Sequence, residues 1–335
     1  MKKALSLLTV LVMVICVTAC GNKNTIQTSS TAGSSNQSGT ETAATSDGES
    51  YRIAMIHQDL STEFETYFNT VLVARCKELG VELIYFDGQG KTDVQLNQCE
   101  NAIEQKVDLL MFTPQDKSGC APIVDKCNAA GIPVMCVITD TDNVDDATAS
   151  VGSNHIESGV IEMEYMADLM GGKGNICIIQ GPYGHSAQLA RQEGILQVLE
   201  GYPDIQVLYE NTANWDRTQA MNLTENWLQK DADNIDAIVC HSDDMGMGAL
   251  QAIQGAGLQD EIKVIGVDGI IDALNSVKAG EMSATVFQDV FGIGENAVDV
   301  ALKILRGEPY EKTTYVPFKL VLQDNVDEYL KNFSK

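Results

Sequence analysis

The sequence predicts an α/β fold of two similar lobes, each built on a doubly wound parallel sheet. Short apolar runs alternate with amphipathic stretches of helical period along residues 52–305, as expected for repeated strand–helix–strand units. The runs are continuously apolar, as in RIAMIH at 52–57, which indicates strands buried on both faces. The alternation pauses in a polar interval at 139–155, so we expect the chain to cross between the lobes there.

The alternation also sets the expected order of the elements. The candidate strands are residues 52–57, 81–86, 107–112, 133–138, 175–179, 205–209, 236–240, 263–267 and 283–287. The candidate helices lie near 62–79, 92–105, 118–130, 156–170, 187–200, 216–230, 244–256, 270–278 and 290–305. In open parallel sheets, ligands bind beyond the carboxyl ends of the strands. The residues that directly follow each strand are therefore the first candidates for a functional site.

The first fifty residues carry the signals of an exported, lipid-anchored protein. A basic start (MKK) precedes an apolar run at 4–17, which is shorter than the roughly 20 residues of a membrane span. The tetrad VTAC, which ends at Cys20, resembles a bacterial lipobox, in which the thiol receives lipid and the chain is cleaved just before it. We therefore predict a lipoprotein signal peptide over 1–19 and lipidation of Cys20.

Residues 20–50 are predicted to form a disordered tether. Ser, Thr, Asn, Gln, Gly and Ala dominate this stretch, and large apolar side chains are almost absent. Such a composition cannot bury enough apolar surface to offset the entropy lost on ordering. A lipidated cysteine followed by a tether implies a protein that is anchored to membrane lipid without spanning the bilayer. We expect it on the extracellular face of the cell membrane.

Charge and length restrict the partners. The formal net charge is −25, and an acidic surface opposes binding to nucleic acid and to anionic membranes, which require clusters of Lys and Arg. We therefore expect no nucleic-acid partner. About 285 residues follow residue 50, which exceeds the usual size of a single core and agrees with two lobes.

The cysteines give no sign of a metal or redox motif. The chain has nine, of which Cys16 would leave with the signal peptide and Cys20 would be lipidated. The remaining seven are odd in number and include no Cys-x-x-Cys spacing, so neither a zinc ribbon nor a redox pair is predicted. Those inside apolar runs are interpreted as small buried hydrophobes.

The residues after the strands have the chemistry of a sugar site. Asp, Gln and Arg are frequent there, and Phe64 and Trp215 add aromatic rings. Planar carboxylate, amide and guanidinium groups can each bind two neighbouring hydroxyls, and aromatic rings stack on the apolar C–H face of a sugar. Their positions at strand ends of both lobes favour one shared site for a polyhydroxylated ligand.

Residues 52–325 resemble the periplasmic sugar-binding proteins of ribose/galactose type, in their Gram-positive lipoprotein form. The resemblance rests on AIVCHSDDMGMGALQAIQGAG at 237–257, VIGVDGIIDAL at 264–274 and ATVFQDVFGIGENAVDVALKILRGE at 284–308. TANWDR at 212–217 is similar to a subset that includes inositol and hexose receptors. The resemblance implies a monomeric receptor, not an enzyme and without a cofactor. It would close on a monosaccharide or cyclitol and deliver it to the permease of an ABC importer.

The same resemblance implies how the lobes are joined. The fold would be of the type I periplasmic-binding-protein kind, with a three-stranded hinge whose segments lie near 153–155, 288–290 and 317–319. The N-terminal lobe would then comprise 51–154 plus 289–317, and the C-terminal lobe 155–288 plus 318–335.

Five ligand contacts follow from positions that match the family. Arg191 would fork onto two ring hydroxyls or onto a ring oxygen. Trp215 stands where the family places a stacking aromatic, and Phe64 would supply a ring from the opposite lobe. Asp268 and Gln288 match the family's hydrogen-bonding Asp and Gln.

Five further positions depart from the family pattern. Ser242 stands where the family usually has Asn, and Gln58, Thr62 and Glu65 stand where it has Ser, Asn and a second aromatic. Asp140 is our choice for the acidic residue that follows the fourth strand. These departures argue against ribose as the ligand.

A metal-binding function competes with the sugar-receptor hypothesis. The four histidines, His57, His155, His185 and His241, lie near predicted strand ends or the hinge, and two have an Asp nearby. No His-x-x-x-His spacing is present, however. The acidic run at 140–146 lacks the central Gly and terminal Glu of a calcium loop.

Catalysis, a charged ligand and signalling are three further hypotheses for this chain. The GPYGHS sequence at 181–186 is neither a nucleophile elbow nor a phosphate loop, so no enzyme is predicted. A cationic or amino-sugar ligand stays open if Glu63 and Glu65 both face the cleft. A receptor that reports to a membrane histidine kinase also stays open, because importer and kinase would read the same closed surface.

Overall fold

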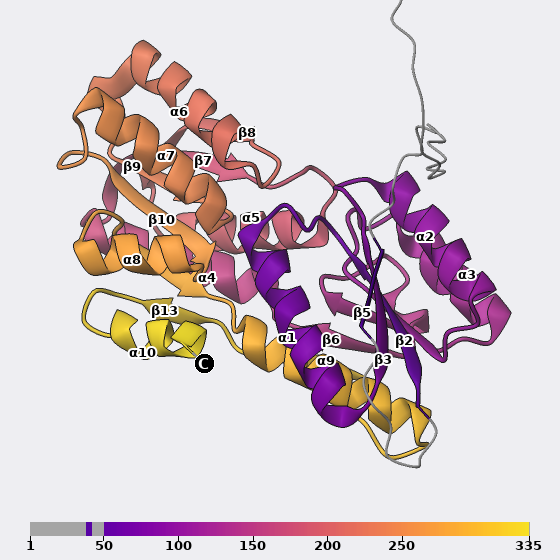
Figure 1. Cartoon of the computed structure of the whole chain (residues 1–335). Coiled ribbons are helices and arrows are strands. Elements are labelled where there is room, and N and C mark those ends of the chain that lie inside the picture. The colour runs from indigo at the N-terminus through magenta and orange to yellow at the C-terminus, as the bar shows by residue number, and fades with distance from the viewer. Residues whose placement is uncertain (1–37, 42–49, 335) are drawn as a thin grey trace, which may run out of the picture. The chain divides into compact units, whose positions relative to one another are not determined.

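A seven-stranded sheet forms the N-terminal lobe in the computed structural model, which describes residues 38–41 and 50–334 (Figure 1). The strand order is β1-β3-β2-β4-β5-β6-β12, and only β1 pairs antiparallel. The strands are β1 (Ser38–Glu41), β2 (Arg52–His57), β3 (Glu82–Asp87), β4 (Leu109–Phe112), β5 (Val134–Ile138), β6 (Ala149–Gly152) and β12 (Thr313–Tyr315). The predicted signal peptide and Cys20 lie outside the described residues.

A six-stranded sheet forms the C-terminal lobe, in the order β13-β11-β10-β9-β7-β8. Only β13 pairs antiparallel, with β11. The strands are β7 (Lys173–Gln180), β8 (Asp204–Thr212), β9 (Ala237–Cys240), β10 (Lys263–Asp268), β11 (Ala284–Phe287) and β13 (Lys319–Val321).

Ten α-helices connect these strands in the described part of the chain. They are α1 (Glu63–Leu79), α2 (Thr92–Glu104), α3 (Ala121–Ala130), α4 (His155–Leu169), α5 (Ser186–Leu199), α6 (Arg217–Asp231), α7 (Asp243–Ala256), α8 (Ile271–Ala279), α9 (Val290–Leu305) and α10 (Val326–Leu330). Three short 3-10 turns complete the set: η1 (Val144–Asp146), η2 (Ala232–Asn234) and η3 (Lys331–Ser334). Within the described ranges, no helix combines the length and apolarity needed to cross a membrane.

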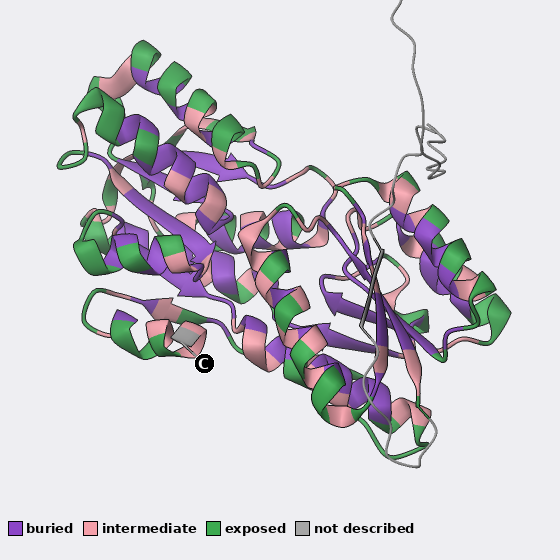
Figure 2. Ribbon diagram, viewed as in Figure 1, coloured by how far each residue is buried: buried purple, intermediate pink, exposed green. Residues whose placement is uncertain are grey.

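Each sheet is buried on both faces, as the continuous apolar runs predict. In β2, Ile53 and Met55 pack in the layer of α1 and α9, while Ala54 and Ile56 pack in the layer of α2 and α3. Figure 1 shows these helix pairs on opposite faces of the N-terminal sheet. The central strands β4, β5, β9 and β11 are accordingly buried along their whole length, whereas the edge strand β8 has several exposed residues (Figure 2). The C-terminal sheet is layered likewise, with α4 and α5 on one face and α6, α7 and α8 on the other.

The chain passes between the two sheets three times, from β6 to α4, from β11 to α9 and from β12 to β13. The predicted fold class, two doubly wound α/β lobes joined by a three-stranded hinge, is confirmed. The interval at 139–155 is not only a crossing, however, because it contains η1 and the buried strand β6. The short strands β1, β6, β12 and β13 were not predicted.

Helix N-termini bring polar side chains to the sheet edges. Thr62 Oγ1 accepts a hydrogen bond from the Glu65 backbone N–H and so caps α1. Ser242 caps α7 in the same way, and Nδ1 of His185 caps α5. Because each cap directly follows a strand end, the capping residues lie at the edge where a ligand of a parallel sheet binds.

Candidate functional site

A cavity of about 60 Å³ lies between the strand ends of the two sheets. Its walls come from both lobes and from two of the hinge segments. The lining residues are Gln58, Thr62, Phe64, Glu65, Ile138, Thr139, His155, His185, Ala187, Arg191, Trp215, Ser242, Asp244, Asp268 and Gln288. Gln58, Thr62, Phe64 and Glu65 belong to the β2–α1 connection and the first turn of α1, and Asp268 is the last residue of β10.

The backbone is strained at three of these positions. Ile138, Trp215 and Asp268 have φ angles of 68°, 62° and 131°. L-residues rarely adopt positive φ, and a β-branched residue such as Ile138 is an extreme case. Each such conformation costs about 1–3 kcal/mol and persists only where the surroundings enforce it, which is typical of functional sites.

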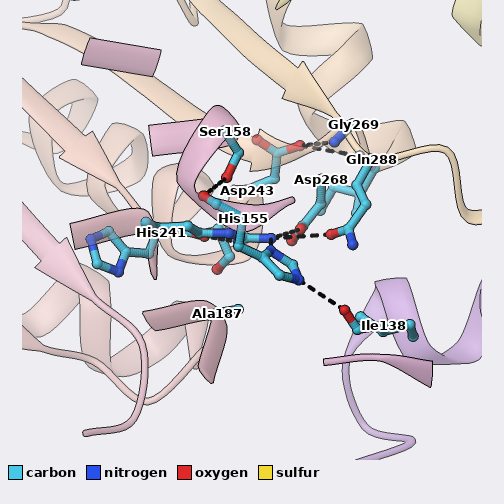
Figure 3. Close-up of polar contacts among 12 residues, drawn as sticks. Ile138, His155, Ser158, Ala187, His241, Asp243, Asp268, Gly269 and Gln288 are labelled. Carbon is cyan, nitrogen blue, oxygen red and sulfur yellow. Dashed lines mark hydrogen bonds and ion pairs between the residues drawn. The ribbon is translucent and has the colours of Figure 1, made fainter. Parts of the chain in front are cut away.

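Arg191 is the central cation of the C-terminal wall. Its side chain is only 4% exposed. Nη2 donates to Gln288 Oε1 at 3.1 Å and lies 3.5 Å from Asp268 Oδ1, and Nη1 donates to the carbonyl oxygen of His241. Figure 3 shows Asp268 and Gln288 converging from neighbouring strand ends. Burial raises the pKa of the Asp268 carboxyl well above its usual value, although Arg191 opposes this.

Two histidines of the cavity are held neutral, each with a defined pattern of hydrogen bonds. Burial, followed by the charge of Arg191, lowers the pKa of both His155 and His185 to about 3. His155 Nε2 donates to the Ile138 carbonyl at 2.9 Å (Figure 3), which leaves Nδ1 as the acceptor that faces Arg191. His185 Nδ1 accepts from the Ala187 backbone N–H, so Nε2 donates across the cleft to Gln58 Oε1 at 3.0 Å.

The N-terminal wall contains a second ion pair, between His57 and Glu65. Glu65 Oε2 lies 2.7 Å from His57 Nδ1. The other ring nitrogen, Nε2, lies 3.0 Å from Asn69 Oδ1. Both nitrogens of the His57 ring therefore have protein partners, and the contact with Nδ1 fixes the direction of the Glu65 carboxyl group.

Asp243, at the start of α7, holds the loop that follows Asp268. Its carboxylate accepts from the backbone N–H groups of Gly269 at 2.6 Å and Ile270 at 3.1 Å, and from Thr285 Oγ1. Gly269 has a φ of 75°, and a Cβ there would lie 2.3 Å from the Phe287 ring, so the loop requires glycine. Asp243 therefore orients the cavity wall without lining it.

A third group of ion pairs lies around Arg217, at the rim of the cavity. Arg217 donates to Asp244 Oδ1 and to Asp272 Oδ2, both at 2.8 Å, and lies 3.8 Å from Glu63 of the opposite lobe. Glu63 Oε1 also accepts from the Ile271 backbone N–H, at the start of α8. Burial, then Asp272 and Asp244, raises the pKa of Glu63.

Two aromatic rings complete the cavity. Trp215 lies beside Arg191, whose guanidinium carbon is 5.8 Å from the ring centroid, and contacts His185 edge-on. A Cβ on Gly181 would come within 2.1 Å of the Trp215 ring, so glycine is required to admit the indole. Phe64 contributes the ring of the opposite lobe.

Three of the four histidines have partners other than a metal ion, whereas neither ring nitrogen of the buried His241 has a hydrogen-bond partner among the described residues. Among residues 38–41 and 50–334, no three His, Cys, Asp or Glu side chains are grouped so that they could hold one. His57 pairs with Glu65, while His155 and His185 bond to Ile138 and Gln58.

A family model described as periplasmic binding protein domain matches residues 53–309. The chain belongs to the periplasmic binding protein family. It is 36% identical over 287 residues to a xylitol-binding protein of Mycolicibacterium smegmatis, covering 86% of this chain and 81% of the relative. The ribose import binding protein of Bacillus subtilis is 32% identical, with 82% and 88% coverage.

A solved structure from Bacillus halodurans is similar in fold as well as in sequence. It is an ABC transporter solute-binding protein with bound myo-inositol, 37% identical, with a TM-score of 0.81. The match covers 85% of this chain and 99% of that one.

This periplasmic binding protein gathers nine of the ten predicted ligand residues on one cavity. The exception is Asp140, which is not among the lining residues. Its backbone N–H donates to Ser186 Oγ across the cleft at 3.0 Å, and the preceding Thr139 lines the cavity instead. That the nine residues contact ligand stays a prediction.

Several residues of this binding protein's site were missed or interpreted differently. His155, His185 and Asp244 line the cavity, and Asp243 supports it, yet none was predicted as a ligand residue. Their positions in the sequence could have pointed to these four residues, because each of them follows a strand end or a hinge segment. The histidines and the neighbouring Asp243 were instead considered for a metal site.

Proposed function

We propose that this chain is a lipid-anchored solute receptor that captures an uncharged monosaccharide or cyclitol by lobe closure and delivers it to an ABC importer. The family supplies the general role of a solute-binding protein. The restriction to uncharged polyols follows from the charges around the cavity.

The observation that carries this proposal is that the ionisable side chains of the cavity wall are already engaged by other groups of the protein. Arg191 lies 3.5 Å from Asp268, Glu65 lies 2.7 Å from His57, and Asp244 lies 2.8 Å from Arg217. The remaining titratable lining groups, His155 and His185, are neutral. A charged ligand would lose its hydration without gaining an unpaired counter-charge, so the cavity favours an uncharged ligand.

The uncharged polar groups of the wall suit hydroxyls. Gln58, Gln288 and Ser242 can both donate and accept, as a hydroxyl does, and Phe64 and Trp215 supply apolar faces for ring C–H groups. The relatives named above carry xylitol, ribose and myo-inositol in their descriptions, which are all uncharged polyols.

Lipid anchoring rests on residues 1–50 alone. Substitution Cys20→Ala should release the protein from the membrane fraction into the medium and abolish labelling by a radioactive fatty acid. An ordinary signal peptide would instead give a protein that is secreted and unlabelled both with and without the substitution.

A thermal-shift screen tests ligand capture. The full-length protein, in mild detergent, is heated with pentoses, hexoses, pentitols, inositols, amino sugars and amino acids. A ligand at 100 times its Kd stabilises the folded state by about 2.7 kcal/mol. We expect shifts from uncharged polyols only, and none in Arg191→Ala. Shifts from amino acids or amino sugars alone would contradict the proposal.

A further inference from the structure

Two cysteine thiols meet between the helices that cover one face of the N-terminal sheet. Cys99 Sγ of α2 lies 3.8 Å from Cys127 Sγ of α3, and both side chains are fully buried. The two helices pack side by side (Figure 1), in the apolar layer that also contains Ala54 and Ile56 of β2. The cysteines are 28 residues apart, so their pairing could not be recognised from their spacing in the sequence.

Helical spacing places the two thiols on the facing surfaces of α2 and α3. Cys99 lies one helical turn after Gln95, and Cys127 lies two turns after Cys120. Cys120 Sγ donates to Gln95 Oε1 at 3.1 Å. The contact between the helices thus has two layers, of which the first joins a thiol to an amide and the second joins a thiol to a thiol. Cys127 is therefore the thiol that Cys99 can reach.

Cys99 is the more acidic thiol of the pair. The hydrogen bond with Cys127 lowers the pKa of the Cys99 thiol, an effect that burial opposes and the nearby Lys126 ammonium supports. Lys126 is held beside the pair by its ion pair with Glu100 of α2. By contrast, burial raises the pKa of the Cys76 thiol, on α1, to about 12. Because a thiolate is the form that attacks a disulfide, Cys99 is suited to be the nucleophile.

We propose that Cys99 and Cys127 form a disulfide that joins α2 to α3, with a low-molecular-weight disulfide as the oxidant. The Cys99 thiolate attacks one sulfur of the oxidant, which releases a thiolate and leaves a mixed disulfide. Cys127 then attacks the Cys99 sulfur and releases the second thiolate, and the two released thiolates take up the two cysteine protons. The sulfurs of a disulfide are about 2.0 Å apart, so they approach by roughly 1.8 Å as the two side chains rotate.

The compartment of a periplasmic binding protein favours this reaction. Disulfides persist in the periplasm and at the cell surface, whereas glutathione and thioredoxin keep cytoplasmic thiols reduced. Because both thiols are buried, the exchange takes place during folding or when α2 and α3 separate locally. The bond restrains the unfolded chain over 28 residues and so stabilises the folded lobe. The inference does not depend on which ligand the cavity binds.

Peptide mapping of the full-length protein, in mild detergent, tests whether the bond forms. The protein is equilibrated with oxidised glutathione, in urea below the unfolding transition, and the remaining thiols are alkylated. Trypsin cleaves after Lys106 and Lys126. Cys99, Cys120 and Cys127 therefore lie on separate peptides, and mass spectrometry identifies which of them are joined.

Thermal unfolding tests whether the bond stabilises the fold. Each protein is compared with itself in oxidised glutathione and in excess dithiothreitol. The variants are Cys99→Ala and Cys127→Ala. The matched controls, Cys76→Ala and Cys120→Ala, each remove a buried thiol outside the pair.

We expect a peptide that joins Cys99 to Cys127 in the oxidised wild type, and a Tm about 5 °C or more above that of the reduced protein. Both variants of the pair should lose the crosslink and the shift, and both controls should keep them. Complete alkylation of Cys99 in the wild type, a bond to Cys120 instead, or a crosslink that leaves the Tm unchanged overturns the inference. The wild-type result decides it even if a variant does not fold.

Discussion

Arg191 and Arg217 contact similar sets of acceptors, but Arg191 is buried and Arg217 is partly exposed. Arg191 is 4% exposed, and its partners are Asp268, Gln288 and a carbonyl oxygen. Arg217 is 36% exposed and contacts Asp244, Asp272 and, more distantly, Glu63. Both use a planar guanidinium to hold acceptors from separate elements in one geometry.

The difference in burial gives the two clusters different roles. A buried pair that loses one partner leaves an uncompensated charge, which typically costs about 3–5 kcal/mol. An exposed pair contributes about 0–1 kcal/mol and weakens with salt. The Arg191 cluster can therefore hold a ligand geometry rigidly, whereas the Arg217 cluster can form and break as the lobes move.

The largest expected effect is that of Arg191→Ala. It should lower the free energy of unfolding by about 1–3 kcal/mol, because Gln288 Oε1 and the carbonyl oxygen of His241 lose their buried donor. Polyol binding should weaken more than about 100-fold, since the guanidinium lines the cavity. Urea denaturation and calorimetry measure the two effects. Stability equal to that of the wild type would show that the contacts of Arg191 contribute nothing to the fold.

The second effect concerns Glu162, a fully buried residue of α4 near Arg191. Burial raises the pKa of its carboxyl well above 4.5. The folded state therefore keeps a proton that the unfolded state releases above about pH 4.5, so stability falls as pH rises toward the folded-state pKa. The slope is about 1.4 kcal/mol per pH unit.

Glu162→Gln removes this titration. Relative to the wild type, the variant should gain stability as the pH rises above about 4.5 and until it reaches the folded-state pKa, as measured by urea denaturation at each pH. The matched Glu164→Gln, on the same helix and exposed, should follow the wild-type curve. Parallel curves for Glu162→Gln and the wild type would contradict a raised pKa.

Arg217→Ala should have a smaller effect on stability, and added salt should remove that effect. Its exposed pairs contribute about 1 kcal/mol at most, and screening at 0.5 M NaCl reduces that contribution further. Because Arg217 links Glu63 to the opposite lobe, we expect polyol to dissociate about three times faster in low salt. Stopped-flow fluorescence of Trp215 measures the rate. An equal acceleration at both salt concentrations would argue for a non-electrostatic role.

The smallest effect is expected for Glu63→Gln. The amide still accepts from the Ile271 backbone N–H and loses only the 3.8 Å pair with Arg217. Stability should change by less than about 0.5 kcal/mol. The raised pKa of Glu63 also means that the wild type approaches the variant as pH falls, since both are then uncharged. A difference that grows on acidification would contradict this assignment.

The two clusters also show what the sequence could predict. Arg191, Asp268 and Gln288 were predicted to share a site because each lies at or near a strand end, and parallel strands bring those ends together. Nine strands were predicted from their apolar runs. The strands β12 and β13 have only three residues, and β6 lies inside a polar interval, so none of the three forms an apolar run.

Pairings between side chains could not be predicted. Residues 57 and 65 lie on a strand and a helix, and only the tight β2–α1 connection brings their side chains within 2.7 Å. Asp140 was chosen from its place after β5, but a strained residue two positions earlier, Ile138, directs the chain so that Thr139 lines the cavity. Backbone torsion angles of this kind cannot be recognised from the composition or the periodicity of the sequence.

The positive φ of Ile138 has an evolutionary consequence. Asparagine or glycine would adopt this backbone conformation at lower cost, but either would remove an isoleucine side chain that is buried in the core of the N-terminal lobe. The carbonyl of the same residue accepts the hydrogen bond from His155 at the hinge. A lineage that substituted this position would therefore exchange core packing for backbone relaxation, and it would do so beside a contact of the hinge.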